Sequence, residues 1–157
     1  MVNIGTPLNQ VDTTAQFTIG SQRMVRDTDF DSMNIYEYHP GGSDSATGTV
    51  YEVSGWSSTG SVTRATTTTR GQIGVAMGTI TSKSYGWYLV KGMGWALCGT
   101  TTASGTAIYA SGTVGSVGAR ATINSLIVGM VSAGAGTPSA TGTVKVSLTF
   151  PSINGAI

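Results

Sequence analysis

The chain has 157 residues, the length of one domain, and is long enough to bury a core without a disulfide or metal staple. Apolar residues make up 39% and charged residues only 10%, which excludes a disordered polar chain and leaves a surface poorly protected against association. All side-chain carboxylates lie at or before Glu52, and the cations after it form no cluster, which argues against a nucleic-acid partner. Acidic residues early in the chain and only basic residues after Glu52 favour docking between copies or onto a partner by charge complementarity.

Residues 1–19 are polar and irregular, and we predict that they form an extended N-terminal arm. Its apolar residues Val2, Ile4 and Leu8 suit a segment that adds to the sheet edge of another chain. The arm shows no pattern of a signal peptide. The most apolar stretch, Leu126–Val131, is far too short to span a membrane, so we expect a protein made in the cytoplasm with no membrane partner.

Two strands are predicted around an acidic turn, one at Arg23–Arg26 and one at Asn34–Tyr38. The alternating acids between them resemble the start of a calcium-binding EF-hand loop. Ser32 stands where that loop needs glycine, and position 12 of the loop is not glutamate, so we predict a solvated turn and no metal.

His39 is the single histidine, and it precedes the strand breakers Pro40 and Gly41. We expect it on the polar surface, because one histidine without cysteine makes a poor metal site. Cys98 is the single cysteine and lies in an apolar run, so we expect a buried, unreactive thiol.

Gly48–Val53 reads as the next strand, and a Ser/Thr-rich excursion loop follows near residues 54–70. Trp56 lies in this loop and has two readings. It is either an anchor for another molecule or a lid packed over the end of the domain.

Gly71–Ala110 is the predicted core, in which short apolar strands alternate with Gly, Ser and Thr turns. We predict one strand at Ile73–Met77 and a second at Ser84–Lys91. Gly92 is expected to end the second strand, and Met93–Cys98 is expected to run back beside it.

Near the C-terminus, Ala121–Val131 reads as a buried strand or strand pair. Thr143–Phe150 alternates most cleanly, with Val144, Val146, Leu148 and Phe150 on one face and Pro151 as its end. The predicted fold is all-β: a small β-barrel or a β-tulip or sandwich of about seven to nine short strands. It comprises the arm, residues 1–19, and a β domain, residues 20–157.

No enzyme is predicted. A Ser-His-Asp arrangement would need His39, which has no nucleophile-elbow serine in its sequence context. There is no phosphate-binding loop, and a carboxylate pair for glycoside hydrolysis would have to come from the first third of the chain. We therefore expect no catalytic residue, cofactor or metal.

Several runs together resemble the capsid cement or decoration proteins of tailed bacteriophages. They are R-M-V-R-D, I-Y-E-Y-H-P-G-G, G-T-V-Y-E-V, G-Q-I-G-V-A, S-Y-G-W-Y-L-V-K-G, G-T-A-I-Y-A-S, L-I-V-G-M-V-S-A and K-V-S-L. The similarity spans roughly Ser21 to Phe150 and matches less well in the arm and the excursion loop.

The resemblance implies a structural virion protein, often a homotrimer, on the outer surface of the phage head. It would bridge neighbouring capsomers of the major capsid protein and stabilise the mature capsid against the pressure of packaged DNA. On this reading, Val2, Ile4, Leu8 and Trp56 are candidate capsid contacts. Trp87 and Trp95 are candidate trimer contacts, with plain core as the alternative for each.

A second hypothesis is a host-recognition or carbohydrate-binding β module, such as part of a head or tail fibre. It would need an exposed aromatic platform on which sugars could stack. A third possibility, a head-to-tail or tail-tube protein, is expected to carry a clearer helix than this sequence shows.

Overall fold

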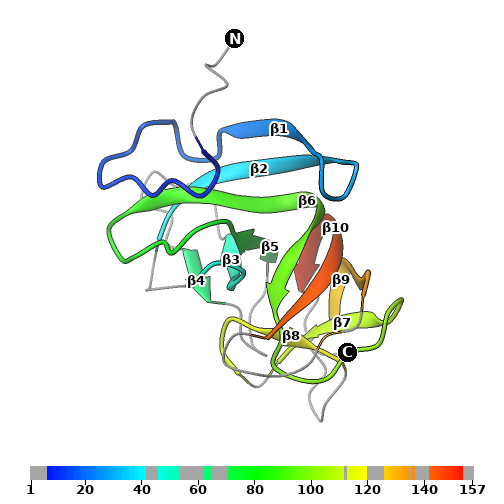
Figure 1. The fold of residues 1–157 in the computed structure, drawn as a ribbon. Coiled ribbons are helices and arrows are strands. Elements are labelled where there is room, and N and C mark those ends of the chain that lie inside the picture. Colours follow the sequence, from blue (N-terminus) through cyan, green and yellow to red (C-terminus); the bar gives the residue numbers. More distant parts are fainter. Residues whose placement is uncertain are drawn as a thin grey trace.

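The structure, a computed structural model, describes residues 7–41, 46–53, 62–64, 71–111, 113–119, 126–134, 136 and 142–153. Within these ranges the chain forms ten β-strands and no helix (Figure 1). The strands are β1 (Gln22–Asp27), β2 (Ser32–Pro40), β3 (Val50–Val53), β4 (Val62–Arg64), β5 (Gly71–Ala76), β6 (Tyr85–Leu97), β7 (Ala107–Ala110), β8 (Val117–Gly118), β9 (Leu126–Ser132) and β10 (Thr143–Ile153).

The strands belong to one bent antiparallel sheet in the order β1-β2-β6-β5-β10-β9-β7-β8, with β3 on β5 and β4 on β3. The sheet does not close into a barrel, and β6 also pairs with β10, so the domain is closest to a sandwich. The all-β prediction is confirmed. The expected strand number was slightly low, because β4 and β8 have only three and two residues and give weak patterns.

Strand β6 joins the two parts of the sheet (Figure 1). Its first half pairs with β2, and its second half pairs with β10 from Lys91 to Leu97. The prediction that Gly92 ends one strand and that the next runs back is therefore wrong. Gly92 instead has φ +112°, a conformation that glycine adopts easily, and the strand continues through it in a new direction.

A β-bulge marks the point where β6 changes partners. Ile35 lies opposite Lys91, whereas the next residue of β2, Tyr36, lies opposite Leu89, so Val90 is an extra residue on β6. One extra residue exchanges the faces of all later side chains. Leu89 points into the main core, but further along β6 the even-numbered Ala96 does so.

The side chain of Asn34 replaces the missing strand pairing at this bulge. Its Oδ1 accepts the Met93 backbone N–H at 2.9 Å, and its Nδ2 donates to the Met93 carbonyl at 2.9 Å. The Asn34 amide also bonds the Tyr36 hydroxyl at 3.0 Å and is completely buried. A Cβ on Gly92 would collide with Asn34 Oδ1, so this contact requires glycine at position 92.

The main core lies between the two parts of the sheet. It joins aromatic side chains of β2 and β6, such as Tyr38 and Trp87, to aliphatic side chains of the lower strands, such as Ile108 and Val146. A smaller cluster, Tyr51, Ala76, Ile80 and Tyr88, packs on the opposite side of β5 and β6. Cys98 is 2% exposed and belongs to the main core, as expected.

Residues 7–19, the described part of the predicted arm, lie against the domain. Asp12 forms a backbone bridge with Tyr85 at the start of β6, with hydrogen bonds of 2.9 and 2.8 Å. Its carboxylate accepts a 2.8 Å bond from the Tyr38 hydroxyl, and the Phe17 ring packs edge-on against Tyr38 at 5.1 Å. Residues 1–6 are outside the described part of the chain.

Strand β10 differs from its prediction at the C-terminal end. It continues through Pro151 to Ile153, because an irregularity between Leu148 and Ser152 shifts its register on β9. Phe150 adopts φ +46° there and is 44% exposed, so it does not share the buried face of the earlier alternating residues. Gly129 permits the distortion, since a Cβ at that position would lie 2.7 Å from the Thr149 carbonyl oxygen.

We predict that Asn34→Ala destabilises the domain by about 2–4 kcal/mol, because it removes a completely buried amide and leaves two partly buried backbone groups of Met93 without their partners. Urea unfolding measures the change in free energy. Asn9→Ala, at an exposed asparagine, is the matched control and should change stability by less than about 0.5 kcal/mol. Equal effects of the two substitutions would contradict the role of Asn34.

We also predict a loss of stability at alkaline pH. Burial, together with the hydrogen bond to Asp12, raises the pKa of Tyr38 to about 12, against about 10 in an unfolded chain. The unfolded state therefore loses this proton first, so stability is full below about pH 10 and declines toward pH 12. Tyr36 and Tyr88 act in the same direction, because burial raises the pKa of each.

Urea unfolding at several pH values measures this decline, and Tyr38→Phe is the diagnostic variant. It loses a hydrogen bond at neutral pH, but its stability should fall less steeply between pH 10 and pH 12. Parallel curves for the two proteins would contradict the assignment to Tyr38.

Candidate interaction surface

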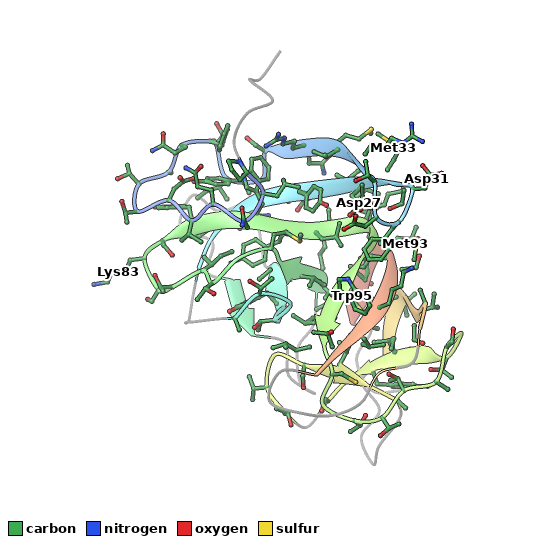
Figure 2. All side chains as sticks on the ribbon, in the orientation of Figure 1. Asp27, Asp31, Met33, Lys83, Met93 and Trp95 are labelled. Carbon is green, nitrogen blue, oxygen red and sulfur yellow. The ribbon has the colours of Figure 1, made fainter. Side chains whose placement is uncertain are left out.

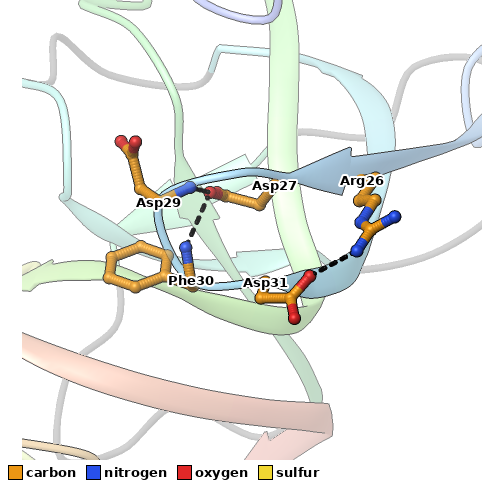
Figure 3. A network of polar contacts seen from close by, with 5 residues as sticks. All are labelled: Arg26, Asp27, Asp29, Phe30 and Asp31. Carbon is orange, nitrogen blue, oxygen red and sulfur yellow. Dashed lines mark hydrogen bonds and ion pairs between the residues drawn. The ribbon is translucent and has the colours of Figure 1, made fainter.

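The turn between β1 and β2 is built by its own aspartates (Figure 3). Asp27 Oδ1 accepts the backbone N–H groups of Asp29 at 2.9 Å and Phe30 at 3.3 Å, a local bond that favours a tight turn. Asp31 adopts φ +47° and pairs with Arg26 at 2.6 Å, while the Asp29 carboxylate points away from these groups. The predicted solvated turn is confirmed, and we call residues 27–32 the hairpin tip.

The hairpin tip holds Phe30 over the outer face of β6 and β10. The Phe30 ring lies 6.0 Å from the Trp95 ring, and the Lys145 Nζ lies 4.4 Å from the Phe30 centroid. The second contact has the geometry of a cation–π interaction. Trp95 and Lys145 are also direct cross-strand partners, so three residues from distant parts of the sequence form one cluster.

Strand register extends this cluster across the sheet. Met93 lies opposite Ser147 of β10, and Ser147 lies opposite Val131 of β9, so these side chains share the outer face with Trp95. We call the set Phe30, Met93, Trp95, Val131 and Lys145 the Trp95 face. Met93 and Trp95 lie on the same side of the molecule as Asp31 and Met33 of the hairpin region (Figure 2).

The Trp95 face is both apolar and cationic. Trp95 is 52% exposed and Val131 is 48% exposed, which is unusual for large apolar side chains that share one sheet face. At the edge of this face, the Lys91 Nζ lies 5.5 Å from the exposed Phe150 ring. Aromatic rings and methionine are enriched in protein interfaces, so this arrangement suits a contact with another molecule.

The described residues do not assemble a reaction centre around His39. Contrary to the expectation of a surface position, His39 is 5% exposed, and its Nε2 lies 3.2 Å from Glu37 Oε2. Strand β2 buries both side chains on the side that faces Tyr88. The sequence could not indicate this, because the breakers after His39 suggested a turn and the strand in fact extends to Pro40.

Glu37 is held in its charged form by hydrogen bonds. Burial alone would raise the pKa of Glu37, but the donors around it outweigh burial and lower the pKa below its ordinary value. Besides His39, they are Gln22 at 2.8 Å and Gln72 at 3.4 Å. These bonds tie β1, β2 and β5 together, which is a structural role.

The described residues offer neither a metal site nor a membrane-spanning helix. No group of three or more His, Cys, Asp and Glu side chains in them could hold a metal ion. None of their segments forms a helix long and apolar enough to cross a membrane.

The residues predicted as contacts fall into three groups. Val2, Ile4 and Trp56 lie outside the described residues, so their roles remain predictions. Leu8 is partly buried against the main core. Trp87 is 2% exposed and offers almost no surface to another chain, whereas Trp95 is available.

Sequence reasoning missed the assembly of the Trp95 face. The alternating pattern of residues 143–150 places Lys145 on the polar face of a strand, and the sequence already indicated Trp95 as a candidate trimer contact. Phe30 gave no signal, because the hairpin tip that carries it is joined to Trp95 only through the tertiary fold. The bulge at Val90 turns Trp95 outward, and Gly92 is the one residue in the sequence that indicates an irregularity near it.

Comparisons with known proteins show the fold. No known protein family matches the sequence, and no curated protein matches it significantly. Among solved structures, the chain is similar to the head fiber gp8.5 N base of bacteriophage phi29, with a TM-score of 0.56 and 11% sequence identity. The match covers 78% of this chain and 99% of that one. At this identity the two chains share an architecture.

The two tryptophans of β6 should respond differently to truncation. We predict that Trp87→Ala costs about 3–5 kcal/mol, because it empties part of the core. Trp95→Ala should cost about 1 kcal/mol, since it loses mainly the Phe30 contact on an exposed face. Urea unfolding of both variants tests this, and a Trp95 cost as large as that of Trp87 would show that Trp95 is a core residue.

Proposed function

We propose that this chain is a structural protein of a bacteriophage head, carried on the outer surface of the capsid. The observation that carries the proposal is the likeness of its fold to the phi29 head fiber base, which extends over 99% of that chain. The cementing role itself comes from the resemblance of residue runs described in the sequence analysis.

In this proposal the protein cements neighbouring capsomers and so stabilises the capsid against internal pressure. The partners are the major capsid protein and further copies of this chain in a homotrimer; nucleic acid, membrane and cofactors have no part. The Trp95 face supplies apolar area and Lys145 for such contacts, and Lys91 lies at its edge. A trimer that grips several capsid subunits needs only modest affinity at each contact, because its sites act together.

The charge distribution supports attachment between protein surfaces. The hairpin tip is acidic and exposed, whereas no acidic side chain follows Glu52 in the sequence, so the strands of the Trp95 face carry only cations. Surfaces of opposite sign placed side by side can orient a partner or a second copy. Salt should weaken such attachment, since the charges lie near solvent.

A fibre role is the second candidate. The likeness to a head fiber base favours it directly, and the exposed Trp95 ring is the type of group on which sugars stack. A glycan array distinguishes the two roles: sugar binding that Trp95→Ala abolishes would favour host recognition over cementing.

We predict that the wild-type protein binds purified heads that lack it and raises their resistance to heat. Trp95→Asp should weaken this binding about tenfold or more, because it places a charge in a contact that must exclude water. Val114→Asp is the matched control, since Val114 is equally exposed, at 50%, but lies in the turn between β7 and β8. Sedimentation of labelled protein with heads measures both.

Trp95 could contact either another copy of this chain or the capsid shell, and the oligomeric mass of the Trp95→Asp protein distinguishes these two contacts. A lower mass places Trp95 between copies, and an unchanged mass places it against the shell. Failure of the wild-type protein to bind heads would overturn the proposed function.

A further inference from the structure

Three charged side chains around the Trp95 face have no partner of opposite sign among the described residues. Asp29 at the hairpin tip is exposed, and its carboxylate points away from the groups that build the turn (Figure 3). The ammonium groups of Lys91 and Lys145 each lie over an aromatic ring, 5.5 and 4.4 Å from the ring centroid, and not beside a carboxylate. Unpaired charges of both signs are therefore present on one side of the molecule.

The same side of the molecule carries exposed apolar side chains. Trp95 and Val131 are about half exposed on the outer face of the sheet, and Met33 is 52% exposed on β2. Figure 2 shows Met33, Met93 and Trp95 on the side where the hairpin tip lies. A surface that combines exposed apolar groups with a rim of charges has the composition of a protein interface.

We propose that the Trp95 face and the hairpin tip of one copy bind the same surface of a second copy across a two-fold axis. Asp29 of each copy then lies opposite Lys145 of the other, and the Trp95 rings of both copies are covered. A two-fold axis brings identical patches together, so a contact from one residue to another is always made twice. Each pair of copies gains two ion pairs and one shared apolar contact.

The signs of the charges favour a second copy over a partner of one sign. An acidic partner surface would attract the lysines of the Trp95 face but would be repelled by Asp29. A basic surface would have the reverse difficulty. A second copy presents an acid and a cation at the same spacing as the first, so a two-fold arrangement satisfies both signs at once.

Lys145 is the better placed of the two lysines for this contact. It is the direct cross-strand partner of Trp95, and its Nζ lies 4.4 Å from the Phe30 ring of the hairpin tip. Lys91 lies further along β6, at the edge of the face. Asp29 is free to bind a second copy, because the turn uses its backbone N–H and not its carboxylate.

The inference rests on the proposed function, in which the Trp95 face is a contact surface, and it names the partner of that surface. A two-fold contact adds to the homotrimer of that proposal, because it can link copies that belong to neighbouring trimers. It also explains how Trp95→Asp would weaken attachment to heads, since linked copies hold the shell at several sites together.

The mass of the full-length protein in solution, measured by light scattering across a concentration series, is the first test. Lys145→Glu should raise the dissociation constant of the oligomer about tenfold or more, because it places two carboxylates opposite each other twice. Asp29→Lys should have the same effect by placing two cations together. Lys83→Glu is the matched control, since Lys83 is exposed at the other end of the molecule and should leave the mass unchanged (Figure 2).

Mixing the two variants tests the two-fold arrangement itself. Lys145→Glu protein and Asp29→Lys protein should associate with each other more tightly than either does with itself, because both ion pairs are restored with their signs exchanged. Native mass spectrometry of the mixture resolves the mixed species. A variant that had simply lost its fold would not be rescued in this way, so rescue distinguishes a contact between copies from a structural defect.

Three results would overturn the inference: a wild type that stays monomeric at every concentration, equal effects of Lys145→Glu and Lys83→Glu, or a mixture without mixed oligomers. Binding to heads separates it from the proposed function. A wild type that binds heads as a monomer removes the two-fold contact and leaves the proposed function intact. A wild type that forms the oligomer but does not bind heads removes the proposed function.

Discussion

The hydrogen bonds between the Asn34 side chain and the backbone of Met93 are the contact on which this architecture depends. Strand β6 must leave β2 and join β10 within a few residues, and at that point regular strand pairing is interrupted. The Asn34 amide supplies one donor and one acceptor to Met93, which are the groups that a neighbouring backbone would have supplied. Gly92 makes room for the amide.

This bend also decides which side chains reach the surface. Trp87 and Trp95 lie on the same strand with the same parity, yet one is in the core and the other is half exposed. The difference follows from the extra residue Val90, which exchanges the two faces of the strand. The bulge therefore decides between the two readings of Trp95 in favour of an exposed position, and the hairpin tip places Phe30 beside it.

Much of the fold could be predicted from local patterns. Runs of apolar and polar residues predicted β1, β2, β5 and the first part of β10. The acidic run between β1 and β2 departs from the calcium-loop pattern, and the turn predicted there is confirmed. Features that depend on distant partners could not be predicted. His39 is buried because β2 continues beside β6 past the expected turn, and Phe150 is exposed because β10 is distorted opposite Gly129. In each case tertiary pairing overrides a local signal.

The candidate surface was predictable only in part, since Trp95 could be named but its neighbours could not. We propose that this protein covers a phage head as a structural component. The copy number of the chain in purified virions, measured by quantitative mass spectrometry against the major capsid protein, tests it most directly. A protein that cements the whole lattice should be present in a number comparable with that of the capsid protein. A small number confined to special positions would indicate a fibre or vertex protein, and absence from virions would contradict the structural role altogether.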